Sequence, residues 1–136
     1  MSAPAPRQVR HHRKSRTLEL IYADGRQANL PCEYLRVFSP SAEVMGHGRD
    51  EPVIVPGKRG VNIERIEAVG QYALRLVFDD GHSTGLYSWD VLDELVRDQA
   101  VLWAGYLARL AEHGMSRDSG ITKLSALPPK KWTPPG

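Results

Sequence analysis

Cysteine is almost absent from this chain, which has a single copy, Cys32, among 136 residues. One cysteine cannot close a disulfide within the chain, and sparse cysteine is typical of proteins from a reducing compartment. Long apolar runs are absent too, and none approaches the roughly 18 residues that a membrane-spanning helix needs. The basic N-terminus has no apolar stretch behind it, so it lacks the form of a secretory signal. We therefore expect a cytoplasmic protein that does not enter a membrane.

Several motifs of nucleotide binding and metal catalysis are also missing. The chain has no Gly-x-x-x-x-Gly-Lys-Ser/Thr loop, no Gly-x-Gly-x-x-Gly turn and no His-Glu-x-x-His pair. It has no Cys-x-x-Cys pair either, so the spacing gives no zinc signal for Cys32, which is typical of a small buried residue; convergence of Cys32 with His47, His82 and a carboxylate stays open. These absences favour a binding module over a stand-alone enzyme.

The positive charge of the chain is concentrated at its start. Residues 1–16 contain five basic residues and no acidic one, while the whole chain has a net charge of only +2, which leaves −3 on the remainder. We expect a disordered basic tail over 1–16. Contact with nucleic acid through this arm is the alternative, but aromatic residues do not interleave the charges as they do in single-strand binders.

One short sequence pattern occurs twice, over residues 18–30 and 74–86. Each copy consists of an apolar segment, an Asp-Gly pair and a second β-prone segment. Asp-Gly favours a two-residue hairpin turn, because glycine tolerates the positive φ angle that such a turn requires. Each copy leads into a helix-like start, at 32–36 and at 88–92. The repeat therefore predicts an α+β fold built from two hairpin-plus-helix units.

Periodicity predicts the remaining elements. Apolar residues at helical spacing predict one long helix over 89–112, with Ser88 as its N-cap and Gly114 as its terminator. This helix covers an antiparallel or mixed sheet within a domain over 17–118. Proline and lysine over 119–136 predict a disordered tail. The sheet is built from strands expected at 17–23, 26–30, 61–69, 72–78 and 83–87.

The second copy of the repeat carries polar and aromatic residues that the first lacks: Asp79, His82, Tyr87 and Trp89. Carboxylates and an imidazole on one tight turn can bind a metal or a small polar ligand. The structural alternative is that Asp80-Gly81 supplies turn chemistry, as Asp24-Gly25 does, and that the two aromatic residues belong to the core. The repeat leaves His82 without an explanation.

Longer motifs stand in order along the chain: Tyr34-Leu-Arg-Val-Phe-Ser-Pro-Ser41, Glu43-Val-Met-Gly-His-Gly48, Val69-Gly-x-Tyr-Ala-Leu74, Phe78-Asp-Asp-Gly-His-Ser-Thr-Gly-Leu-Tyr-Ser-Trp89 and Leu102-Trp-x-x-Tyr-Leu-x-x-Leu110. Together they resemble the domain of unknown function 971 family, also called the gamma-butyrobetaine hydroxylase-like N-terminal domain. The resemblance spans about residues 17–118.

The resemblance implies a comparison with carnitine-synthesis dioxygenases, in which a similar domain holds a structural zinc ion through three cysteines and a histidine. The histidine position falls on His82, and the cysteine positions fall on Ser39, Ser41 and Val44, so we expect that zinc site to be lost here. The iron and 2-oxoglutarate chemistry of those enzymes belongs to a separate catalytic domain, which we do not expect in this chain. Similar domains are also fused to P-loop ATPases that carry iron–sulfur clusters, which implies a role in metal or cofactor assembly.

Three functional hypotheses follow, and the oligomeric state stays open. The first is a small non-catalytic module that binds a protein partner, such as a metal-dependent enzyme or an assembly factor. Its surface combines the 79–89 turn with the 39–60 loop, using Asp79, His82, Tyr87, Trp89 and Glu43. The second is an iron- or zinc-binding protein that uses His82 and His47 together with carboxylates or Cys32. The third is nucleic-acid contact through the 7–16 arm.

Overall fold

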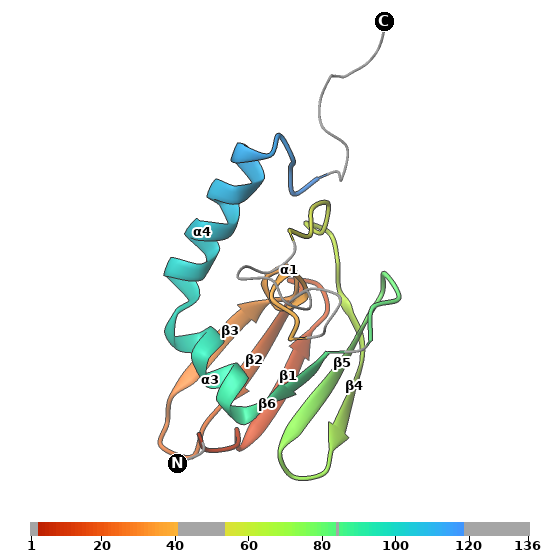
Figure 1. Ribbon diagram of the computed structural model, residues 1–136. Coiled ribbons are helices and arrows are strands. Elements are labelled where there is room, and N and C mark those ends of the chain that lie inside the picture. The colour runs from red at the N-terminus through yellow and green to blue at the C-terminus, as the bar shows by residue number, and fades with distance from the viewer. Residues whose placement is uncertain (1–2, 41–53, 84, 119–136) are drawn as a thin grey trace, which may run out of the picture.

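The structure is a computed structural model that describes residues 3–40, 54–83 and 85–118. It contains two three-stranded antiparallel sheets, of order β1-β2-β3 and β4-β5-β6, together with helices (Figure 1). The predicted α+β class is thereby confirmed, although the strands divide into two sheets rather than one. The elements are β1 (Gln8–His12), β2 (Thr17–Ile21), β3 (Gln27–Pro31), α1 (Cys32–Val37), β4 (Ile63–Val69), β5 (Ala73–Phe78), β6 (Leu86–Ser88), α3 (Trp89–Arg97) and α4 (Gln99–Glu112).

Both Asp-Gly pairs form turns where the repeat predicts them, but each loop has three residues rather than two, because the Tyr22 amide donates to the Arg26 carbonyl and the Phe78 amide to the His82 carbonyl, each at 2.9 Å. Gly25 and Gly81 take φ angles of +92° and +93°, the left-handed region that favours glycine. The first turn joins β2 to β3, and the second follows β5 in a meander whose last strand is β6. This second unit runs through 63–88, with β6 shorter and slightly later than the predicted 83–87 strand.

The basic N-terminal segment is not wholly disordered, so our prediction for 1–16 is wrong over 8–12. These residues form β1, which pairs with β2 in antiparallel register, with His11 opposite Leu18. The Arg7 amide extends the pairing by donating to the Ile21 carbonyl at 2.7 Å. The segment has few apolar residues that could signal a strand. Main-chain hydrogen bonds to β2 hold it in place instead.

The predicted 89–112 helix is divided, which corrects the expectation of one long helix. α3 ends and α4 begins on either side of Asp98, whose φ and ψ angles are −106° and 19°. The predicted caps are confirmed at both outer ends. Ser88 Oγ accepts from the Val91 amide at 3.2 Å, and Gly114 takes a φ of +64°. The break allows α3 and α4 to pack against different parts of the core.

Side chains from both sheets meet in one shared core. A second, smaller cluster joins α1 to α4 through Val37, Tyr106 and Leu110. In Figure 1, α4 runs from α3 past α1 and continues beyond the strands. Within the described residues, no helix is both long and apolar enough to cross a bilayer. The shared core includes the fully buried Leu18, Leu20, Leu30, Leu35, Ile63, Leu76 and Leu92.

Candidate functional site

Asp80, on the second hairpin turn, is bound to three groups, two of which come from other segments of the chain. Its carboxylate accepts from Arg36 Nε at 2.8 Å, Lys58 Nζ at 2.7 Å and the His82 amide at 3.0 Å. Burial alone would raise the pKa of Asp80, but the hydrogen bonds from Lys58, the His82 amide and Arg36 lower that pKa to about 2. Asp80 is therefore an ionised residue that ties the turn to α1 and to the 54–60 segment.

Asp79 makes a second internal connection. Its amide donates to the Asn62 carbonyl at 2.9 Å, and its Oδ1 accepts from the Asn62 amide at 3.1 Å. Asn62 Oδ1 in turn accepts from His11 Nε2 at 2.8 Å, and Asn62 Nδ2 donates to the Arg13 carbonyl at 3.0 Å. Asp79 thus helps to hold β1 against the second sheet, and its main-chain pairing with Asn62 is structural.

His82 is buried and contacts Ser39, which is the pair of positions that the family resemblance assigns to one ligand set. His82 Nε2 lies 2.9 Å from Ser39 Oγ, and the two residues are 8% and 0% exposed. The Tyr87 hydroxyl also hydrogen-bonds Ser39 and donates to the Leu35 carbonyl at 2.5 Å. A Cβ atom on Gly85 would overlap Ser39 Oγ, so only glycine fits beside this cluster.

The described residues around His82 do not fit a zinc ion. A zinc ion needs several thiolate or imidazole ligands, whereas the group facing His82 Nε2 is a serine hydroxyl. Across the described ranges, no group of three or more His, Cys, Asp or Glu side chains could hold a metal. Ser41, Glu43, Val44 and His47 lie outside these ranges, so a site built from His82 and His47 stays a prediction.

Trp89 and Cys32 both have structural environments. The Trp89 indole donates to the Gln71 carbonyl at 2.7 Å, which fixes the start of α3 against the β4–β5 turn. Cys32 is fully buried, and its thiol lies 3.6 Å from Asn62 Oδ1. Burial raises the pKa of Cys32 to about 11, so the thiolate that acts as a nucleophile is disfavoured.

One motif did not enter our sequence interpretation. Gly81-His-Ser-x-Gly85 has the Gly-x-Ser-x-Gly spacing of a hydrolase nucleophile elbow. That elbow requires a sharp turn from a strand into a helix. Here the segment joins the antiparallel strands β5 and β6, and the imidazole of His82 contacts Ser39 rather than Ser83. The motif therefore lacks the structural setting of a serine hydrolase.

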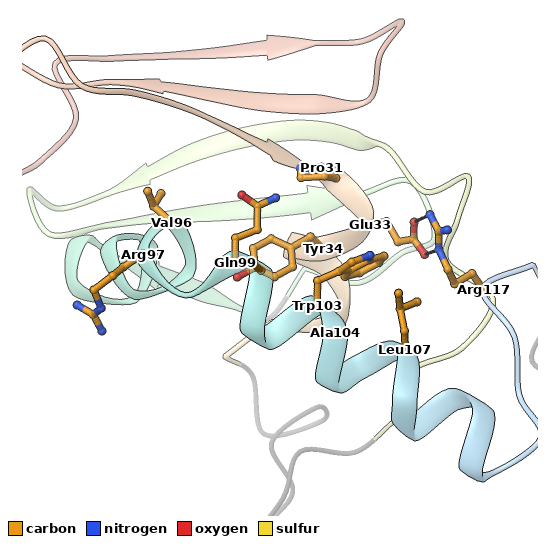
Figure 2. A pocket seen from close by; sticks show the side chains of 11 residues that line it. Pro31, Glu33, Tyr34, Val96, Arg97, Gln99, Trp103, Ala104, Leu107 and Arg117 are labelled. Atoms are coloured by element: carbon orange, nitrogen blue, oxygen red, sulfur yellow. Dashed lines mark hydrogen bonds and ion pairs between the residues drawn. The ribbon is translucent and has the colours of Figure 1, made fainter.

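A groove that sequence reasoning missed lies between α4 and the β3–α1 junction (Figure 2). It has a volume of about 670 Å³. The Trp103 ring packs edge-on against Tyr34, with 6.1 Å between ring centroids, and the Arg117 guanidinium lies 5.2 Å from the Trp103 ring centroid. The lining residues are Pro31, Glu33, Tyr34, Val96, Arg97, Gln99, Ala100, Trp103, Ala104, Leu107 and Arg117.

One end of the groove is closed by an ion pair between distant segments. Arg117 donates to both carboxylate oxygens of Glu33, from Nη2 at 2.6 Å and from Nε at 2.8 Å. The Glu33 side chain is only 6% exposed, so this pair is shielded from solvent. Such a two-point contact fixes geometry as well as charge. The groove therefore has rigid walls at this end.

The outward face of α4 is apolar along most of its length. Its residues expose Val101 at 76% and Leu107 at 39%. Every exposed side chain between residues 100 and 111 is apolar, and Glu112 is the first exposed charged residue after them. The sequence signal was present, because apolar residues lie on several sides of α4, but the sequence analysis used them only to predict a helix. The outward residues are Ala100, Val101, Ala104, Leu107, Ala108 and Ala111.

Comparison with known proteins identifies relatives of solved structure. Two proteins solved in solution by NMR are 47% and 50% identical to this chain, with TM-scores of 0.76 and 0.75. Each alignment covers 92% of this chain, and 98% and 93% of the respective relative. A third relative, a crystallised protein of unknown function from Acidithiobacillus ferrooxidans, belongs to the domain of unknown function 971 family. It is 38% identical, with a TM-score of 0.56, over 66% of this chain and 90% of that chain.

No curated protein matches the chain. The family model described as gamma-butyrobetaine hydroxylase-like, N-terminal, matches residues 9–93. The match begins inside β1, which places that strand within the domain rather than in a tail before it. It also covers both hairpins and most of α3, which is more than half of the chain. This chain therefore belongs to the gamma-butyrobetaine hydroxylase-like N-terminal family, the family also known as domain of unknown function 971.

Proposed function

We propose that this protein is a small non-catalytic interaction module that binds a protein partner through the outward face of α4 and the adjacent groove. This choice moves the binding surface away from the 79–89 turn. In that turn, the polar groups of Asp79, Asp80 and His82 already contact other parts of the fold. The α4 face, in contrast, presents exposed apolar side chains beside the groove.

The observation that carries the proposal is the composition of the exposed surface of α4. A helix that is apolar all round is usually buried, and large exposed apolar patches mark interaction sites. In the isolated chain, the Val101 side chain is 76% exposed and the Leu107 side chain is 39% exposed. Complete burial of such a side chain contributes roughly 1.5–3 kcal/mol. A partner that covers this face would therefore gain substantial binding free energy from these residues.

The family suggests the class of partner. The fusions noted above connect similar domains to ATPases that carry iron–sulfur clusters, and the carnitine-synthesis enzymes connect them to a metal-dependent catalytic domain. We propose that the partner is a metal-dependent enzyme or a cofactor-assembly factor. The protein would then contribute recognition, while the partner carries out the chemistry.

Photocrosslinking in cells tests the proposal. A photoreactive benzoylphenylalanine at position 107 should give a discrete adduct, whose partner is identified by mass spectrometry. Adding Ala104→Lys should abolish that adduct, because the lysine places a charge in the middle of the face. The matched probe at position 64, an exposed position on β4, should not give the same adduct. Absence of an Ala104-dependent adduct at position 107 would contradict the proposal.

A further inference from the structure

The outward face of α4 is nearly symmetric about Ala104. Ala100 and Ala108 lie four residues on either side of it, and Val101 and Leu107 lie three residues on either side. All five residues are exposed. The face therefore has the same order of small and large apolar side chains when it is followed in either chain direction. A surface for an unrelated partner has no need of such symmetry.

This symmetry is what a twofold interface requires. In an isologous contact, the same patch is used by both subunits, so that residue i meets residue j and residue j meets residue i. If two α4 helices cross antiparallel at Ala104, Val101 of each copy lies opposite Leu107 of the other. Alanine at four-residue spacing leaves a shallow groove between ridges, which allows two helices to approach closely.

The charges that flank the apolar face select the antiparallel arrangement. Arg97 is the last residue of α3, just before the start of α4, and Glu112 is the last residue of α4. An antiparallel crossing brings Arg97 of each copy close to Glu112 of the other, whereas a parallel crossing would bring like charges together. Arg97 already pairs with Asp93 at 3.5 Å and Asp98 at 3.4 Å. Its side chain is nevertheless 64% exposed, and it lines the same groove as Ala100 and Ala104.

We propose that two copies of this chain associate through antiparallel α4 helices about a twofold axis at Ala104. The inference rests on the proposed function and goes beyond it: in the free protein a second copy covers the α4 face, and a metal-dependent enzyme or an assembly factor would displace that copy. α4 has 14 residues. At 1.5 Å per residue this makes the helix about 21 Å long. One such helix pair covers less than the roughly 1,200–2,000 Å² typical of a stable complex, so the dimer is expected to be weak and concentration-dependent.

Sedimentation of the purified full chain tests this proposal. Between micromolar and millimolar concentrations, the weight-average mass should rise above the 15.2 kDa of one chain. Ala104→Lys should abolish that rise, while the matched variant Ala68→Lys, at an exposed position on β4, should behave like the wild type. Circular dichroism of each variant verifies that the fold is intact. A wild-type chain that stays monomeric throughout, or association that survives Ala104→Lys, would overturn the proposal.

A charge exchange tests the antiparallel arrangement. Arg97→Glu and Glu112→Arg should each weaken association several-fold, and the double variant should restore most of it. Failure of the double variant to recover would overturn the proposed pairing. This experiment also separates the inference from the proposed function. If the purified chain is monomeric while the Ala104-dependent adduct to another protein forms in cells, the second copy is the wrong partner and the interaction module still stands.

Discussion

Asp80 connects three segments that are far apart in the chain. It pairs with Arg36 of α1 and with Lys58, and it accepts from the amide of His82. The sequence interpretation treated Asp80 as a turn residue equivalent to Asp24, which explains its position but not its partners. Asp24 contacts Arg26 within its own turn. Local sequence could predict both turns, whereas the ion pairs of Asp80 depend on how the two units pack.

The pKa of Asp80 leads to a prediction at this scale. Because the pKa is about 2 in the folded protein and near 3.9 when unfolded, its ionisation stabilises the fold above about pH 4. This contribution should be lost as the pH falls towards 2. We expect Asp80→Asn to lower the free energy of unfolding by about 1 kcal/mol at pH 7, allowing for solvent screening, and by much less near pH 2.

Urea denaturation at both pH values measures this difference. Asp24→Asn is the matched control, because Asp24 occupies the same turn position in the first hairpin and its side chain is 59% exposed. The control should have a smaller effect at pH 7. An Asp80→Asn effect that is equally large at both pH values would contradict the electrostatic explanation.

Among the secondary-structure elements, both hairpins could be predicted from the sequence, whereas β1 and the division of the C-terminal helix could not. Glycine at a positive φ angle gives a local signal for both turns. The edge strand β1 has no comparable signal, since its pairing depends on main-chain hydrogen bonds to β2. The division of the C-terminal helix at Asp98 was missed because helical apolar spacing continues through it. Tertiary packing, not local preference, decides these two features.

The contact between β1 and the second sheet leads to a prediction about local opening. Asn62 connects His11 and Arg13 of the N-terminal segment to the start of β4. We expect Asn62→Ala to cost about 1–3 kcal/mol, because it removes several partly buried hydrogen bonds. Amide protection should fall most in β1, by roughly tenfold or more in hydrogen exchange.

Hydrogen exchange followed residue by residue checks this expectation. Asn29→Ala provides the control, since Asn29 lies exposed on β3 and should change protection little. Equal loss of protection across both sheets after Asn62→Ala would show that β1 does not open separately, and would contradict the prediction.

For the whole molecule, the shared core predicts one cooperative unit. Leu76 of β5 is fully buried among residues of both sheets. We expect Leu76→Ala to lower the free energy of unfolding by about 2–5 kcal/mol. The unfolding transitions seen by circular dichroism and by tryptophan fluorescence should shift together. Leu86→Ala, at a position 39% exposed, should cost much less. Two separated transitions would contradict a shared core.

The groove also belongs to the scale of the whole molecule. It forms because Arg117 returns to pair with Glu33, which lies 84 residues earlier in the chain. No short motif contains that information, so the sequence directed attention to the polar turn around His82 instead. The turn lies against Ser39, and its polar groups contact other parts of the fold. In the sequence, the apolar face of α4 could be recognised only because the helix has more apolar residues than its buried side needs.

The position of β1 gives the basic arm a further consequence. β1 is one of the two edge strands of its sheet, and main-chain groups that stay unpaired on an edge strand can recruit a strand from another molecule. Arg10 lies exposed on this strand, and Arg13 and Lys14 follow in the turn beyond it. Positive charge on an edge repels an identical edge and so opposes stacking into filaments. The arm that first suggested nucleic acid is thus expected to oppose edge-to-edge aggregation of the sheet.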